Sequence, residues 1–170
     1  MIFTDGTEIL PKNDNDLFYT CSLIEFIGRE VKQKRSDLVN FLGKENIKHL
    51  YSIADVLHCE QIKYVAEDYI NEWNIPNGNF DNIKACEYNI PSYWNIGKNY
   101  SRLIEDITEP EKNLLYNNAN IAWTNKVIDS LFMVYNSLID EAMSDYNSDF
   151  YYQQRAYIYL CYKYNNILED

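Results

Sequence analysis

The sequence has few of the residues that interrupt regular structure. Its 170 residues include only 5 glycines and 4 prolines. Folds built from many short strands need frequent turns, and turns depend on these two residues, so their scarcity favours a few helices joined by loops. Hydrophobic residues make up 46% of the chain. That share is enough for a buried core and argues against wholesale disorder.

Positive charge is also scarce. Lysine and arginine number 15 against 26 acidic residues, which gives a net charge of −11. Proteins that bind nucleic acid draw affinity from basic side chains that displace counterions, so direct nucleic-acid binding is not expected. The same charge suits a basic protein partner attracted by electrostatic steering, although an acidic surface also serves solubility alone.

The sequence lacks paired cysteines, a leader peptide and long apolar runs. Its four cysteines are far apart and form no Cys-x-x-Cys pair, which predicts reduced thiols rather than a disulfide framework. The first residues lack the charged and apolar regions of a signal peptide, and no apolar run is long enough to cross a bilayer. We therefore expect a cytoplasmic protein that makes no membrane contact.

Apolar residues recur at helical spacing along most of the chain. A first helix is expected from residue 13 or 14 to about residue 32, with further helices over 36–42, 45–57, 60–73 and 92–107. Ser36 or Asp37 would cap the second helix and Gly43 would end it. Residues 74–91 read as an irregular stretch, with a turn signal at Asn77-Gly78. The apolar stripe of the first helix comprises Leu17, Cys21, Ile24, Ile27 and Val31.

The segment Thr108-Glu109-Pro110 is typical of a helix start, with threonine as the cap and proline in the first turn. Two long helices are expected after it, and the short connection near Ser148 predicts an antiparallel hairpin. We therefore predict an all-α fold. Residues 1–107 would form a helical body and residues 108–170 a C-terminal helical hairpin, sharing one core.

Tyrosine is abundant, with 16 copies. An AT-rich genome accounts for many of them, but tyrosine also supplies large contact area at binding surfaces. Several tyrosines of the last predicted helix fall off its buried seam and lie near acidic residues. They form either peripheral packing or a partner-binding patch. The predicted partner-binding residues are Tyr146, Asp149, Tyr151, Tyr152, Tyr159 and Tyr162.

No reactive motif is complete. Adjacent residues on a helix point about 100° apart, so His58-Cys59 is a poor nucleophile–base pair. Asp55 and His58 have the spacing of two metal ligands, but a bound metal needs a second cluster. The basic run Arg29 to Arg35 would suit a helix-turn-helix, against the acidic remainder of the chain. We predict no catalytic, cofactor-binding or metal-binding residue, and an enzyme site near His58 and Cys59 stays an alternative.

Four short segments in the first half of the chain share a further pattern. They are Cys21–Glu25, Asp37–Val39, Asp55–His58 and Tyr64–Ile70. Together, over residues 16–70, they resemble a short uncharacterised bacterial helical domain encoded beside genes for ADP-ribosyltransferase-like toxins. The family often has threonine where this chain has Cys59. The resemblance implies a toxin–antitoxin or effector–regulator pairing and brings no catalytic residues.

The leading functional hypothesis is therefore a protein-binding module, antitoxin-like or regulatory. It would neutralise a basic protein partner, such as an ADP-ribosyltransferase-like toxin, by steric and electrostatic masking. One alternative is an acidic inhibitor that mimics nucleic acid and blocks a nuclease or defence system. The other is the enzyme noted above. The sequence leaves the partner and a homo-oligomeric state open.

Overall fold

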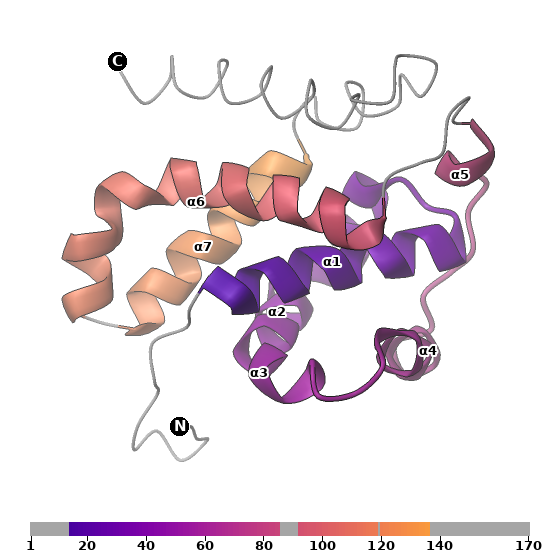
Figure 1. Ribbon diagram of the computed structural model, residues 1–170, viewed down its shortest axis with the longest axis horizontal. Coiled ribbons are helices and arrows are strands. Elements are labelled where there is room, and N and C mark those ends of the chain that lie inside the picture. The colour runs from indigo at the N-terminus through magenta and orange to yellow at the C-terminus, as the bar shows by residue number, and fades with distance from the viewer. Residues whose placement is uncertain (1–13, 86–91, 119, 137–170) are drawn as a thin grey trace.

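The structure is a computed structural model that describes residues 14–85, 92–118 and 120–136 (Figure 1). Every regular element in these ranges is a helix, which confirms the predicted all-α class. None of the described helices is long and apolar enough to cross a membrane. The helices are α1 (Asp14–Val31), α2 (Arg35–Ser52), α3 (Ala54–Leu57), α4 (Ile62–Glu72), α5 (Asn82–Ala85), α6 (Tyr93–Asn118) and α7 (Asn120–Tyr135).

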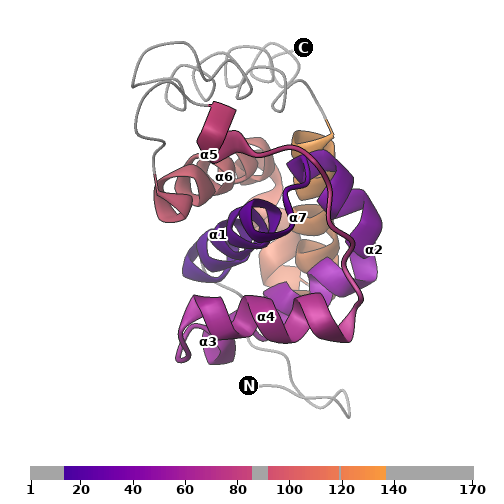
Figure 2. The same ribbon diagram turned by 90° about the vertical axis from the view of Figure 1, so that its right-hand side faces the viewer.

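Helix α1 is the centre of the fold. It contacts α6 most extensively and also packs against α2, α3 and α4 (Figures 1 and 2). The predicted apolar stripe of this helix is buried, as expected. Because neighbours surround the helix, polar residues outside the stripe are buried too, and no amphipathic pattern predicts them. These buried polar residues are Asp16, Thr20, Ser22 and Glu25.

Helices α6 and α7 form an antiparallel hairpin. Glu111 near the end of α6 pairs with Lys126 at 2.6 Å. Tyr100 nearer the start of α6 stacks on Tyr135 at the end of α7, with ring centroids 4.1 Å apart and planes 3° from parallel. Helix α7 also lies against α2, where Lys44 bonds Asp129 at 2.8 Å. The hairpin therefore shares one core with α1 and α2.

The helix start predicted at Thr108 is wrong. Helix α6 continues from residue 93 to residue 118 with Pro110 inside it. Proline removes the N–H that would bond the carbonyl of Asp106, but both residues are exposed, so the disturbed turn faces solvent. The Thr108 hydroxyl is turned back along the helix and donates to the Ile104 carbonyl at 2.9 Å. The predicted division at residues 107 and 108 thus lies inside one helix.

The two-part organisation itself stays a prediction, because the second helix of the expected hairpin lies outside the described residues. On α7, residues at three- and four-residue spacing are buried, namely Thr124, Ile128, Leu131 and Tyr135. Ile121, at the start of the helix, is 56% exposed and therefore does not belong to this core.

The second predicted helix has different limits. Helix α2 begins at Arg35 after Lys34, without a side-chain cap from Ser36 or Asp37. The break expected at Gly43 is present, because Gly43 has non-helical backbone angles, with φ at +80°, and divides α2 into two helical segments. Glycine adopts this conformation readily. The predicted break around His58 is confirmed, since α3 ends at Leu57 and α4 begins at Ile62.

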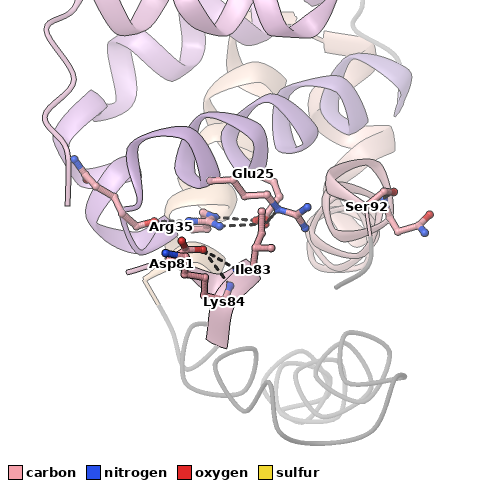
Figure 3. A network of polar contacts seen from close by, with 9 residues as sticks. Glu25, Arg35, Asp81, Ile83, Lys84 and Ser92 are labelled. Carbon is pink, nitrogen blue, oxygen red and sulfur yellow. Dashed lines mark hydrogen bonds and ion pairs between the residues drawn. The ribbon is translucent and has the colours of Figure 1, made fainter. Parts of the chain in front are cut away.

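A buried ionic network joins α1 to the start of α2 (Figure 3). Arg35 donates from Nε to Oε1 of Glu25 at 2.8 Å and from Nη2 to Oε2 at 3.1 Å. Arg29 Nε donates to the same Oε2 at 2.8 Å. Burial alone would raise the pKa of the Glu25 carboxyl, but Arg35, and then Arg29, through charge and hydrogen bonds, hold this pKa below its ordinary value. The carboxylate is therefore ionised and paired at neutral pH.

The same network holds the segment that follows α4. The Arg35 guanidinium also donates to the Gln33 carbonyl. Gln33 Nε2 donates to the Pro76 carbonyl at 2.5 Å, and the Gly78 N–H donates to the Val31 carbonyl at 2.7 Å. Residues 76–80 are thereby fixed along the corner between α1 and α2.

The turn predicted at Asn77-Gly78 does not form, because these residues run along that corner without turning. A Cβ at Gly78 would lie 2.5 Å from the carbonyl oxygen of Lys32. Glycine is therefore needed here for close backbone approach rather than for a turn.

The arginines of the basic segment from Arg29 to Arg35 are largely buried in the structure rather than exposed. The side chain of Arg35 is only 4% exposed and that of Arg29 only 11%. Both point inward to Glu25, so they do not form the exposed basic face that a helix-turn-helix would use on phosphates.

Removal of the Glu25 carboxylate should strongly destabilise the protein. In Glu25→Ala the buried guanidinium of Arg35 loses its partner, and we expect the free energy of unfolding to fall by about 3–5 kcal/mol at pH 7. Urea denaturation followed by circular dichroism measures this change. The control is Asp129→Asn, which breaks the exposed pair with Lys44 and should cost less than about 1 kcal/mol. Equal losses in the two variants would contradict the proposed role of Glu25.

The same carboxylate predicts a pH dependence. Because its pKa is lower in the folded state, its contribution is complete above the ordinary value of 4.5 and disappears as the pH falls through the folded-state pKa. The stability difference between the wild-type protein and Glu25→Gln should therefore shrink on acidification below about pH 4.5. Urea titrations at several pH values test this, and a difference that grows toward acidic pH would contradict it.

Helices α1 and α6 approach each other closely at Gly97. A Cβ at this position would lie 2.6 Å from both the backbone nitrogen and the Cα of Ser22, and closer still to Ser22 Oγ. Contacts below 3.0 Å with backbone cannot be relieved by turning a side chain. A residue larger than glycine would therefore push the two helices apart.

Gly97→Ala should destabilise the protein by about 1–3 kcal/mol, because overpacking at the crossing outweighs the better helix propensity of alanine. The matched control is Asn95→Ala on the exposed side of the same helix, which should be neutral or stabilising by about 0.5 kcal/mol. Thermal and urea unfolding of both variants decide the sign. A stabilising Gly97→Ala would mean that the helices do not pack this closely.

Candidate functional site

An open pocket of about 440 Å³ lies beside α1. Helix α1 forms one wall, the turn between α3 and α4 a second, and the start of α6 a third. The volume falls within the range of about 300–1,000 Å³ that is typical of ligand sites. The lining residues are Tyr19, Phe26, His58, Glu60, Gln61, Ile62, Lys63, Tyr93 and Trp94.

Aromatic rings dominate the pocket. The rings of Tyr93 and Trp94 lie 4.9 Å apart at 44°, and those of Tyr19 and Trp94 lie 6.4 Å apart at 49°. Phe26 meets Tyr93 edge-on at 4.9 Å, and the His58 ring lies 6.4 Å from Tyr19. The tilted planes form walls that meet at an angle. Of the tyrosine, tryptophan and phenylalanine rings at the pocket, Trp94 is the most exposed, at 37%, whereas Tyr19 is buried.

Local backbone structure places these side chains. The residues after α3 turn tightly, with the Cys59 N–H bonded to the Val56 carbonyl at 3.1 Å and the Glu60 N–H to the Leu57 carbonyl at 3.0 Å. This turn brings His58 and Glu60 to the pocket. Across the pocket, the Ser92 hydroxyl accepts from the Asn95 N–H at 3.1 Å and caps the start of α6.

The pocket carries a negative field at the Tyr19 hydroxyl. Burial, and after it the charge of Glu60, raise the pKa of Tyr19 to about 12. The hydroxyl therefore stays protonated and points to the Leu57 carbonyl at 3.5 Å. Lys63 also lines the pocket and opposes this field, but its side chain is exposed and long enough to turn away.

The residues predicted for partner binding lie elsewhere. Tyr146, Asp149, Tyr151, Tyr152, Tyr159 and Tyr162 are all outside the described residues, so the predicted tyrosine patch stays a prediction.

The reactive residues considered in the sequence do not assemble. His58 lines the pocket, whereas the exposed Cys59 thiol faces back along its own turn, 3.8 Å from the Asp55 carbonyl. Within residues 14–85, 92–118 and 120–136, no three histidine, cysteine or acidic side chains form a group suited to a metal ion.

Comparisons with known proteins add no relative. No protein-family model, no curated protein and no solved structure matches this chain. The resemblance of residues 16–70 to a toxin-associated helical domain therefore stays a prediction.

The aromatic pocket was not predicted from the sequence. Tyr93 and Trp94 lie in the helix predicted over 92–107, whose apolar face could use either Trp94 or Ile96, and the structure buries Ile96 and leaves Trp94 37% exposed. Two adjacent aromatic pairs, Phe18-Tyr19 and Tyr93-Trp94, gave a partial signal. Neighbouring side chains on a helix point about 100° apart, so one ring of such a pair often lies at the edge of the core.

The two described cysteines should differ sharply in reactivity. Burial is the main reason that the pKa of Cys21 is raised to about 12, and the side chain has no exposed surface. At pH 8, iodoacetamide should alkylate Cys59 in the native protein and Cys21 only after denaturation. Mass mapping of individual peptides measures each site separately. Equal native rates at the two cysteines would contradict the burial of Cys21.

Proposed function

We propose that this protein is a binding module that neutralises or regulates a basic protein partner. The observation that carries the proposal is the open aromatic pocket next to Glu60, on a chain of net charge −11. Aromatic residues are enriched where interfaces are tight, and an acidic surface attracts a basic partner before contact.

The turn before α4 places one acidic residue, Glu60, at the pocket. Further exposed acidic residues lie outside the pocket lining on α4 and α3, namely Glu67, Asp68, Glu72 and Asp55. The same stretch offers apolar contact area, because Val56 is 56% and Tyr64 is 55% exposed. A partner could therefore bury aromatic and aliphatic surface while its basic groups meet carboxylates at the rim.

An ADP-ribosyltransferase-like toxin is the partner that the sequence resemblance suggests. Masking of such a toxin needs no chemistry from the binding module. It needs only a surface that covers the toxin's cleft for nucleotide or target protein, and a complex that dissociates slowly. The proposed mode of action is accordingly steric and electrostatic.

Co-expression with the product of the neighbouring gene tests this function. We expect a stable complex on size-exclusion chromatography, relief of any toxicity of that product, and a complex that weakens with salt. The double variant Glu60→Gln/Trp94→Ala should weaken binding at least tenfold by calorimetry, about 1.4 kcal/mol.

The control variant is Asp129→Asn, which removes one exposed charge on α7, outside the pocket lining, and should leave affinity unchanged within twofold. Circular dichroism of each variant checks that the fold is retained. Absence of a complex with the wild-type chain, together with undiminished toxicity, would overturn the proposed function.

A further inference from the structure

The geometry points to a more specific ligand: we propose that the aromatic pocket binds an arginine guanidinium group, presented by the basic partner. This inference rests on the proposed function for the source of the arginine, but the binding chemistry belongs to the pocket alone.

The first argument is the shape and polarity of the ring faces. Tryptophan and tyrosine faces are electron-rich and attract cations within about 6 Å of the ring centroid. The Trp94 ring packs at 44° against Tyr93 and at 49° against the buried Tyr19, and it is the exposed ring on which a flat group can stack. Trp94 is 37% exposed, which leaves its ring accessible to a ligand.

The second argument is the charge at the rim. Glu60 is exposed and lines the pocket, and a carboxylate accepts two parallel N–H donors from a guanidinium. Its field already reaches the Tyr19 hydroxyl. An anionic ligand would meet both this carboxylate and the negative faces of the rings, so the pocket selects against anions.

The third argument separates arginine from lysine. A guanidinium is planar, weakly hydrated and able to stack, whereas an ammonium is a compact, strongly hydrated charge. The exposed Trp94 ring at the pocket offers a face on which a planar guanidinium can stack. Gln61 adds an amide oxygen that can accept from a further N–H of the guanidinium.

Removal of the Lys63 charge should change the affinity for a cation in the opposite direction to removal of the Glu60 charge. The Lys63 ammonium lines the same pocket and repels a cation. Removal of this charge should strengthen the binding of a guanidinium, whereas removal of the Glu60 charge should weaken it. A site for an uncharged or anionic ligand would not respond in this pair of directions.

The experiment uses the full chain and two blocked amino acids, N-acetyl-arginine amide and N-acetyl-citrulline amide. Citrulline has nearly the shape of arginine but no charge. Binding is followed by NMR shifts of the indole N–H of Trp94, which Trp94→Phe assigns. We expect arginine to bind with a Kd of about 1–10 mM and citrulline at least fivefold more weakly. Blocked lysine should lie between them.

The variants then test the role of each group. Glu60→Gln should weaken arginine binding about two- to fivefold, and Lys63→Gln should strengthen it about twofold. Glu67→Gln is the matched control, since it removes an equivalent exposed charge from α4 outside the pocket lining and should change affinity by less than twofold. Because all three positions are exposed, these variants should fold even if Trp94→Ala does not.

Equal binding of arginine and citrulline, preferred binding of an anion, or no response to Glu60→Gln would overturn the inference. The outcomes also separate the two proposals. One outcome is a stable complex with a basic partner whose affinity does not change in Glu60→Gln and Trp94→Ala. It would overturn the arginine site and support the proposed binding function. Binding of arginine without any complex with a basic protein would support the arginine site and overturn the proposed binding function.

Discussion

The fold depends on one buried carboxylate. Glu25 lies inside the protein with its side chain only 3% exposed, and ionisation at such a site is sustained only by close cations. Arg35 supplies a two-pronged contact and Arg29 a third bond. The geometry fixes the angle at which α2 leaves α1. Through Gln33 it also fixes the path of the chain after α4.

The position of the pocket follows from this constraint. Helix α1 contributes Tyr19 and Phe26 to the pocket while Glu25 holds the helix to α2. The close approach at Gly97 then sets the start of α6 against α1, which brings Tyr93 and Trp94 to the same pocket. The aromatic walls thus come from segments far apart in the sequence that two packing constraints bring together.

This architecture separates stability from binding. The residues that hold α1, α2 and α6 together are buried, whereas Glu60, Lys63 and Trp94 remain exposed at the pocket. Charge at the rim can therefore change without an effect on the core. For a protein whose proposed task is to fit one basic partner, recognition can then be adjusted at the surface while the scaffold persists.

The sequence alone determined the helical class, the extent of α1 and α4, and the burial of the first apolar stripe. The spacing of apolar residues depends on the local sequence alone, so it predicts these helices without knowledge of the tertiary structure. The sequence did not determine that α6 continues through Pro110, because an exposed position lets water satisfy the disturbed turn. It also did not determine that Arg35 turns inward, because a charge next to a helix start usually faces solvent.

Only the tertiary structure decided where the pocket lies. Tyr19, Glu60 and Trp94 are separated by dozens of residues, and no local pattern relates them. Their meeting results from the crossing of α1 and α6 and from the tight turn before α4. Helical periodicity shows which face of each helix is apolar, but the crossing is set by the contacts between faces, which only the folded chain contains.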